Sequence, residues 1–304
     1  GDFDGRVWII QGGSTMQAVV VFLAAMSVVS VAELWVKAQP LEDEKDSGND
    51  GIMENPMPLG DNIFLEPNNK SGDAVAKWKP ESGANPEELG LYVEGDILLP
   101  SGDMSRNGLT RAASRWPEAT VPYELSPDFN DNDRAVINKA IEFYHNVTCV
   151  RWVPRTEEDE NYVYFDRNRT GCWSYVGRTG GRQKLNLQSP ECLYRIGTAV
   201  HEMMHALGFL HEQSRWERDR YVKIHFENIK PGRESNFQKG KKHRIDGQGV
   251  SYDYGSVMHY SAYAFSKNGK ATIVPKDKGV KTLGQRKGLS QKDIQKIRNM
   301  YNCC

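Results

Sequence analysis

The sequence predicts an α+β fold, and three observations carry that prediction. Five short segments between residues 121 and 187 have the β-branched and aromatic residues, or the flanking turns, that are typical of strands. Three other segments repeat apolar residues at the spacing of a buried helix face. The long stretch after residue 211 shows little periodicity, so we expect it to be mostly irregular. The chain has 304 residues, 38% of them apolar, which is enough for one large domain or two small ones.

The strands are predicted at residues 121–125, 150–153, 162–165, 173–176 and 184–187. The first helix is expected to begin near Asp131, a residue type that favours the N-cap position. Its apolar residues share one face: Ile137, Ala140, Ile141 and Tyr144. A second helix is expected at residues 194–207. A third follows Ser290, which forms a capping box with Asp293.

The N-terminal stretch divides by composition. We interpret residues 1–15, which precede Met16, as a non-native upstream segment without function. Residues 16–32 carry no charge and end in small residues of the kind that signal peptidase cleaves, so they predict a signal peptide and an extracellular, secreted protein. A membrane anchor is the alternative, although the run is short of the roughly 20 residues that span a bilayer.

An acidic segment joins a basic one at residue 107. Residues 33–106 hold 6 Lys and Arg against 16 Asp and Glu, whereas residues 107–304 hold 32 against 22. Opposite charges attract, which favours an acidic propeptide that lies on a basic domain. A disordered acidic tail is the alternative. Residues 33–90 show little periodicity and are expected to be loosely ordered, with order returning at residues 91–99.

A histidine motif indicates a metal site. The segment His201-Glu202-x-x-His205 places both imidazoles on one helix face, where they can bind one zinc ion with Glu202 beside them as general base. His211 follows six residues later, and Gly208 permits the turn that would bring it back to the metal. Three protein ligands leave one zinc position for water, which is typical of a catalytic site.

The extended motif predicts a methionine in a tight turn downstream, and Met258 lies 47 residues after His211. Glu212 directly follows the third histidine, and Arg215, Arg218 and Asp219 come soon after it. From about residue 116 to residue 303 the chain therefore resembles the astacin family of metzincin peptidases. One departure is Glu217, where the family more often has Asp, and it keeps the charge.

The resemblance implies a catalytic domain at residues 107–304 with a zincin-like fold of two lobes. A twisted mixed sheet and the zinc helix form the first lobe, the second is largely irregular, and the active-site cleft with the methionine turn lies between them. The segment at residues 173–176 would form the sheet edge that an extended substrate joins as an added strand.

The resemblance also implies the roles of individual residues. One zinc ion per subunit would be held by His201, His205 and His211, with Tyr260 as a further ligand at rest. Glu202 and Tyr260 would be catalytic, since the phenol can swing to stabilise the oxyanion. Met258 would pack beneath the zinc site, although a plain core methionine looks the same in sequence.

Residues 93–96 resemble a motif that keeps enzymes of this family inactive before processing. Val93-Glu94-Gly95-Asp96 resembles the aspartate switch of the family, Phe-x-Gly-Asp, with Val93 in place of the aromatic residue. The resemblance implies that Asp96 occupies the open zinc position until the propeptide, residues 33–106, is removed.

Activation requires a cut between this segment and the catalytic domain. We predict cleavage between Arg106 and Asn107, with Arg111 and Arg115 as alternatives. The new ammonium group of Asn107 is then expected to pair with Glu212 and to order the cleft.

The chain has five cysteines, an odd number, so one is left over if the others pair. The resemblance implies disulfides Cys149–Cys303 and Cys172–Cys192, and it leaves Cys304 unassigned. Three triplets have the form of glycosylation acceptors, beginning at Asn69, Asn146 and Asn168.

These observations together predict a secreted zinc endopeptidase, made as a zymogen, that acts on protein or peptide substrates and is inhibited by its own propeptide. We expect a monomer without stable membrane association. Nucleic acid is not an expected partner, because the basic run at residues 241–244 has no aromatic residues beside it for stacking. The alternative is a non-catalytic zinc-binding module, against which Glu202 and Tyr260 argue, since a structural site needs neither.

Overall fold

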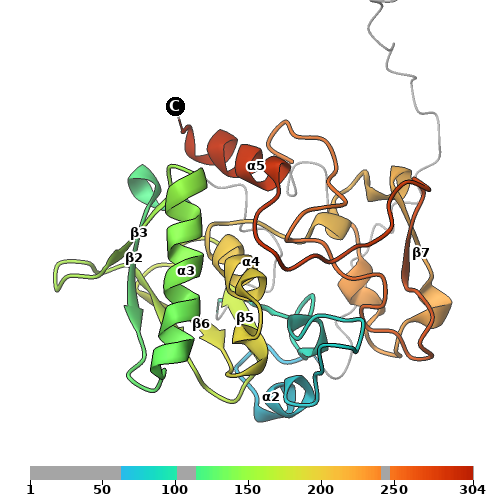
Figure 1. The fold of residues 1–304 in the computed structure, drawn as a ribbon, viewed down its shortest axis with the longest axis horizontal. Coiled ribbons are helices and arrows are strands. Elements are labelled where there is room, and N and C mark those ends of the chain that lie inside the picture. Colours follow the sequence, from blue (N-terminus) through green and yellow to red (C-terminus); the bar gives the residue numbers. More distant parts are fainter. Residues whose placement is uncertain (1–62, 101–113, 241–246, 304) are drawn as a thin grey trace, which may run out of the picture. The chain divides into compact units, whose positions relative to one another are not determined.

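A six-stranded mixed sheet organises the computed structural model, which describes residues 63–100, 114–240 and 247–303 (Figure 1). Its strands are β1 (Ile97–Leu98), β2 (Thr120–Leu125), β3 (Arg151–Pro154), β4 (Tyr162–Asp166), β5 (Cys172–Tyr175) and β6 (Arg182–Leu187). They lie in the order β1-β5-β6-β4-β2-β3, and among these pairs only β5 and β6 run antiparallel. The predicted α+β class, mixed sheet and five strands are confirmed.

The described residues contain four α-helices: α2 (Asn69–Val75), α3 (Asp131–Val147), α4 (Ile196–Ala206) and α5 (Gln291–Tyr301). Helix α3 begins at Asp131, as predicted, but the prediction that Asp131 is its N-cap was wrong. Asn130, not Asp131, is the N-cap, because its side chain accepts the backbone N–H of Asp133 while the carboxylate of Asp133 accepts the backbone N–H of Asn130. The capping box of Ser290 and Asp293 on α5 is confirmed.

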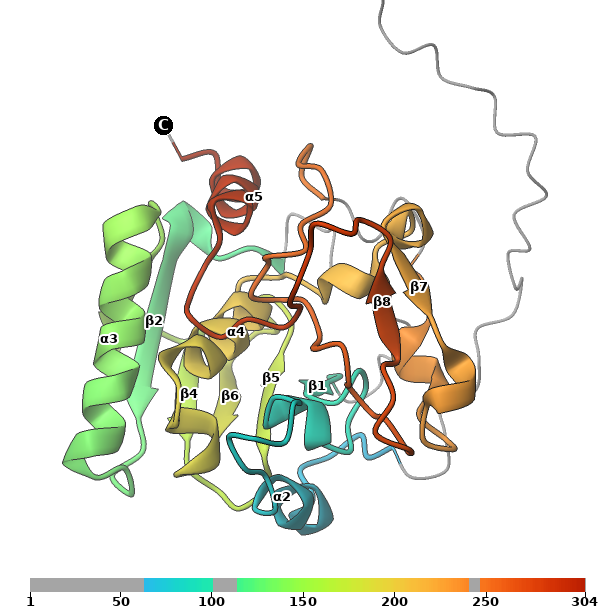
Figure 2. The same ribbon diagram turned by 45° about the vertical axis from the view of Figure 1, so that its right-hand side comes forward.

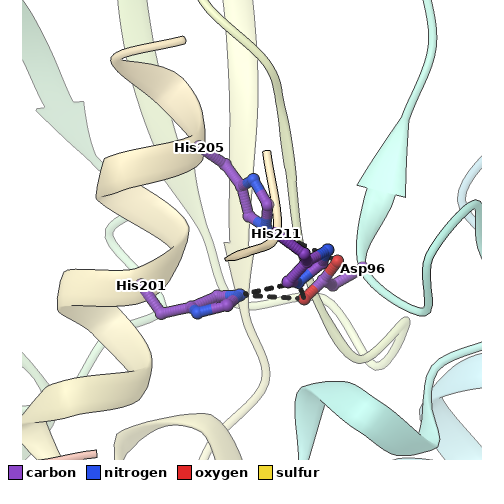
Figure 3. A group of neighbouring side chains, drawn as sticks. All are labelled: Asp96, His201, His205 and His211. Atoms are coloured by element: carbon purple, nitrogen blue, oxygen red, sulfur yellow. Dashed lines mark hydrogen bonds and ion pairs between the residues drawn. The ribbon is translucent and has the colours of Figure 1, made fainter. Parts of the chain in front are cut away.

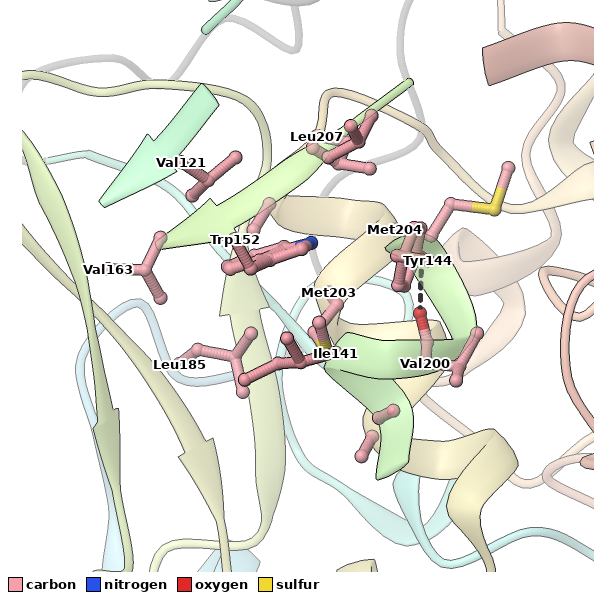
Figure 4. Packing of buried hydrophobic residues seen from close by; sticks show 14 of the residues in the cluster. Val121, Ile141, Tyr144, Trp152, Val163, Leu185, Val200, Met203, Met204 and Leu207 are labelled. Carbon is pink, nitrogen blue, oxygen red and sulfur yellow. Dashed lines mark hydrogen bonds between the residues drawn. The ribbon is translucent and has the colours of Figure 1, made fainter. Parts of the chain in front are cut away.

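The main core lies between the sheet and helices α3 and α4 (Figures 1, 2 and 4). Trp152 and Leu185 on the strands pack with Ile141 on α3 and Met203 on α4. Burying one such side chain contributes about 1.5–3 kcal/mol. The hydroxyl of Tyr144 donates a 2.8 Å hydrogen bond to the carbonyl of Val200, so α3 is tied to α4.

The residues between α4 and α5 form mostly turns and short 3-10 helices, which fits the prediction that this stretch is mostly irregular. Strands β7 (Val222–Ile224) and β8 (Ile273–Pro275) pair antiparallel there. A second apolar cluster includes Phe237, Tyr260 and Phe265 and supports this part of the chain. The 3-10 helices of the described residues are η1 (Glu87–Leu89), η3 (Pro117–Ala119), η4 (Glu191–Leu193), η5 (Glu212–Ser214), η6 (Arg218–Arg220), η7 (Phe226–Asn228) and η8 (Glu234–Phe237).

The acidic segment is more ordered than its composition predicted. The described part begins at residue 63 and contains α2, η1 and β1, so the expectation that order returns only at residue 91 was wrong. The acidic segment is ordered by contacts with distant parts of the chain. The spacing of apolar residues along the sequence does not predict such contacts. The hydroxyl of Tyr92, for example, donates to the carbonyl of Thr170 at 2.7 Å. The proposed upstream segment, signal peptide and propeptide boundary at residue 107 lie outside the described residues.

Two disulfides have the pairing that the resemblance implies. Cys149–Cys303 joins the chain just after α3 to the chain just after α5, with 5.5 Å between the Cα atoms. Cys172–Cys192 joins β5 to η4, with 5.7 Å between the Cα atoms. Cys304 lies outside the described residues. None of the described helices is long and apolar enough to cross a bilayer.

Candidate active site

Helix α4 and the turn after it bring three imidazoles together (Figure 3). His201 and His205 are one turn apart on α4, and their ring centroids lie 4.7 Å apart. The helix ends at Ala206, and Gly208 adopts a φ of +111°, a conformation that favours glycine. The chain turns there and returns His211 to within 4.7 Å of the ring of His205 and 5.1 Å of that of His201.

Asp96, from the acidic segment, points its carboxylate at these rings (Figure 3). Its Oδ2 is 3.0 Å from Nε2 of His201 and 3.3 Å from Nε2 of His211, and its Oδ1 is 3.6 Å from Nε2 of His205. One ligand atom from each of the four residues lies within 4.8 Å of the others, and all four side chains are buried. This is a group that can hold one metal ion.

The hydrogen bonds of the histidines fit a zinc ion. Nδ1 of His201 donates to the carbonyl of Val257 at 2.8 Å, and Nδ1 of His205 donates to that of Phe209 at 2.7 Å. With the proton on Nδ1, each Nε2 presents a lone pair to the centre of the group. Nε2 of His205 and Oδ1 of Asp96 have no hydrogen-bond partner among the described residues. Converging buried lone pairs of imidazole and carboxylate are the donor set that zinc takes.

The charges around the group also favour a cation. Burial alone would lower the pKa of His211, but the carboxylates of Asp96 and Glu94 outweigh it and raise that pKa to about 9. Burial alone would raise the pKa of Asp96, whereas His211 and His205 hold it well below its usual range. Burial and the nearby Arg286 lower the pKa of His201, which favours the neutral, metal-binding imidazole.

Glu202 lies on α4 directly after His201 and is fully buried. Neither of its carboxylate oxygens has a hydrogen-bond partner among the described residues. Burial and the negative charges of Asp96 and Glu87 raise the pKa of Glu202 well above its ordinary value. A buried carboxylate without a partner is costly to maintain, and such groups are concentrated at functional sites.

The turn that contains Met258 contacts the chain directly after the third histidine. Met258 is buried in the main core, and its carbonyl accepts the backbone N–H of Glu212 at 3.0 Å. Two residues later, the hydroxyl of Tyr260 donates to the carbonyl of Glu94 at 2.6 Å, and its ring lies 4.6 Å from that of His211. In this state the phenol of Tyr260 is bonded to the acidic segment. Its expected role as a zinc ligand therefore stays a prediction for the processed enzyme.

Glu212, expected to receive the ammonium group of Asn107, already has cationic partners. Its Oε1 accepts from Arg215 at 3.0 Å and from the backbone of Asp253 at 2.8 Å, and its Oε2 accepts from Lys296 on α5 at 2.5 Å. Burial alone would raise the pKa of Glu212, but Lys296 and Arg215 lower it. Asn107 lies outside the described residues, so its pairing with Glu212 stays a proposal. In such a pair, Lys296 would have to share the carboxylate of Glu212 with the new ammonium group or lose its contact with it.

We expect replacement of Lys296 by methionine to destabilise the zinc-loaded protein by about 3 kcal/mol, since removal of one partner leaves a buried charge poorly compensated. Arg215 remains, so the loss should stay at the low end of the range for broken buried pairs. Urea unfolding followed by circular dichroism measures the change. Lys292→Met on the same helix is the control, because Lys292 is half-buried and bonds only a backbone carbonyl. Equal losses in the two variants would contradict the importance of the Lys296–Glu212 pair.

Two acidic residues that anchor the acidic segment were not predicted from the sequence. Glu87 forms a buried ion pair with Arg286 and accepts from the hydroxyl of Thr198 on α4 at 3.3 Å. Glu88 accepts both the backbone N–H and the hydroxyl of Ser261 at 2.6 Å. Burial raises the pKa of Glu88, although Arg286 opposes the rise. The two adjacent glutamates at residues 87–88 were the one sign in the sequence of such contacts. The neighbouring sequence could not identify their partners, which lie about 110 to 200 residues away.

Comparisons with known proteins agree with this geometry. The family model for the peptidase family Astacin matches residues 108–302. The chain belongs to the astacin family. It is 46% identical over 214 residues to zinc metalloproteinase nas-14 of Caenorhabditis elegans, a match that covers 70% of this chain and 42% of nas-14. It is 41% identical over 223 residues to zinc metalloproteinase nas-4 of the same organism, covering 71% of this chain and 70% of nas-4.

A solved structure shows the same astacin fold. High choriolytic enzyme 1, a hatching enzyme zinc-protease from Oryzias latipes, superimposes with a TM-score of 0.58 at 37% identity, covering 62% of this chain and 94% of that one. Astacins are zinc-dependent peptide hydrolases, so zinc is the cofactor of this family's site. The chain thus carries an astacin domain, although it spans about half the length of several relatives that it matches.

Proposed function

We propose that the chain is a secreted zinc endopeptidase synthesised as a zymogen. The observation that carries the proposal is the carboxylate of Asp96 among three histidine Nε2 atoms, beside the buried and unpartnered carboxylate of Glu202. Asp96 belongs to the acidic segment. The space among the three histidines, where catalysis would take place, is therefore occupied by a part of the chain that processing can remove. A non-catalytic zinc module has no need of this arrangement.

The roles proposed for the astacin residues follow from where they lie. His201, His205 and His211 would hold the zinc ion, which when bound would supply a water of lowered pKa and polarise the peptide carbonyl. Glu202 takes the proton of the attacking water and passes it to the leaving amine. The phenol of Tyr260, freed from the carbonyl of Glu94, donates a hydrogen bond to the oxyanion of the tetrahedral species.

Strand β5 is proposed to hold the substrate backbone. In this structure β1 pairs with β5 in parallel, Ile97 opposite Ser174, and the backbone N–H of Ser174 donates to the carbonyl of Asp96 at 2.9 Å. The acidic segment therefore occupies an edge of the sheet that an extended peptide could join. Removal of residues 33–106 would open this edge and the zinc site in one step.

Secretion and glycosylation belong to the same proposal. The predicted signal peptide directs the chain out of the cell, where disulfides such as Cys149–Cys303 persist. The acceptor asparagines Asn69, Asn146 and Asn168 are all exposed, as glycosylation requires.

Cleavage before Asn107 is our proposed activation step. Of the two alternative cleavage positions, Arg111 and Arg115, the structure describes only Arg115, whose guanidinium donates a hydrogen bond to the carbonyl of Met300 at 3.0 Å.

Peptide hydrolysis by the processed form tests the proposal. We expect the protein that begins at Asn107 to cleave casein and internally quenched peptides. A zinc chelator should abolish the activity, and added zinc should restore it, because the metal supplies the activated water. The chelator should have no effect in the presence of excess zinc, which serves as the control. A protein that binds zinc stoichiometrically yet cleaves neither substrate would instead be the non-catalytic module.

A further inference from the structure

Glu94, two residues before Asp96, contacts three separate parts of the chain outside the acidic segment. Its side chain is buried, and its Oε2 accepts from Nδ1 of His211 at 2.8 Å. Its carbonyl oxygen accepts the phenol of Tyr260 at 2.6 Å, and its backbone N–H donates to Oδ1 of Asn236 at 3.1 Å. Glu94 thus joins the acidic segment to the third histidine, to the methionine turn and to η8.

The backbone of Glu94 is strained in a way that fits this arrangement. Its φ is +50°, which a residue with a side chain rarely adopts. Such strain costs on the order of 1 kcal/mol or more and persists only where surrounding contacts enforce it. The three contacts of Glu94 supply that enforcement, and they turn its carboxylate toward His211.

The partner of His211 differs in kind from those of the other two histidines. Nδ1 of His201 and Nδ1 of His205 donate to neutral backbone carbonyls, of Val257 and Phe209, which belong to the astacin domain itself. Nδ1 of His211 donates to a carboxylate on the removable segment. A carboxylate on the far nitrogen makes an imidazole a more basic ligand and fixes its orientation, and loss of such a partner commonly costs 10- to 100-fold in metal affinity.

We propose that Glu94 is a positioning residue of the uncut protein, whose carboxylate fixes His211 and so tightens zinc binding before activation. Its backbone carbonyl meanwhile retains the phenol of Tyr260. This inference rests on the proposed function only in taking His211 as a zinc ligand. Asp96 closes the metal site from the side of Nε2, and Glu94 fixes His211 from the side of Nδ1. Both contacts are lost in one event when residues 33–106 leave, so the processed enzyme gains an open metal position and a mobile phenol together.

Zinc affinity of the uncut protein tests the proposal without any peptidase assay. Competition with a chromophoric chelator would be measured for Glu94→Ala and Glu94→Gln, each in a background with Asp96→Ala, so that Asp96 makes no contribution. We expect the alanine variant to bind zinc about 10- to 100-fold more weakly than its background. The glutamine variant should lose less, because its side-chain oxygen can still accept the proton of His211.

Glu88→Gln in the same background is the matched control, since Glu88 also anchors the segment but contacts Ser261 and no histidine. Its zinc affinity should stay within about twofold of the background. Unchanged affinity in Glu94→Ala, or an equal loss in Glu88→Gln, would overturn the proposal, because Glu94 would then act at most as a general anchor. Failure of the proposed function is a separate result: the processed wild type would cleave no peptide, while the zinc affinities would still report on Glu94.

Discussion

Replacing Glu202 with glutamine should leave zinc binding and the fold intact and should lower kcat/KM of the processed enzyme by several orders of magnitude. Glu202 is fully buried, directly follows His201 on α4, and has no hydrogen-bond partner among the described residues. Glutamine keeps the size of the side chain but cannot accept the proton of the attacking water. General-base catalysis alone contributes about 10²- to 10⁴-fold, and the same residue is proposed to return the proton to the leaving amine.

The experiment measures peptide hydrolysis, bound zinc and near-UV circular dichroism on the same preparations. Glu191→Gln is the control, since Glu191 is a half-buried carboxylate in η4, just before α4, and bonds Gln188 rather than any residue of the site. It should retain activity close to wild type. If Glu202→Gln stayed within tenfold of wild type with normal zinc content, Glu202 would not be the general base.

The parts of the site that depend on local spacing could be predicted from the sequence. His201 and His205 are one helical turn apart, and Gly208 permits the reversal that returns His211, so the three rings follow from one short motif. Strands β2 to β6 and helix α5 were predicted for the same reason, since each has its own strand-forming residues, flanking turns or capping residues. Errors of a residue, as at the N-cap of α3, arise because Asn130 and Asp131 are both good capping residues.

The contacts of the acidic segment could not be predicted in this way. Glu87 meets Arg286 across 199 residues, and β1 is a two-residue strand whose pairing with β5 has no local signal. The role of Glu94 could not be predicted, because it depends on a positive φ and on the position of His211. Both are properties of the tertiary structure. The place of Asp96 was implied only by resemblance to the aspartate switch.

Changing Asp96 to alanine in the uncut protein should release peptidase activity without processing. The carboxylate of Asp96 lies 3.0–3.6 Å from all three histidine Nε2 atoms, where the attacking water must bind. Alanine removes these contacts and leaves room for water. We expect activity at least about tenfold above the uncut wild type, which corresponds to about 1.4 kcal/mol of relieved inhibition.

The released activity should remain below that of the processed enzyme, because two other features of the acidic segment stay in place. Strand β1 still occupies the edge of β5, and Glu87 still pairs with Arg286 beside α4. The proposed latency would therefore have a chemical component, which the Asp96 variant removes, and a steric component, which only cleavage removes. N-terminal sequencing of the active wild type should begin at Asn107.

The assay uses Asp96→Ala with Arg106 also replaced by alanine, and mass spectrometry of the intact chain shows that no processed enzyme contributes. Asp73→Ala is the control, since Asp73 is an exposed acid on α2 whose ion pair with Arg169 lies on the surface. Its activity should stay at the level of the uncut wild type. If uncut Asp96→Ala is equally silent while the processed enzyme is active, the carboxylate does not maintain latency, and the blocked edge of β5 accounts for it alone.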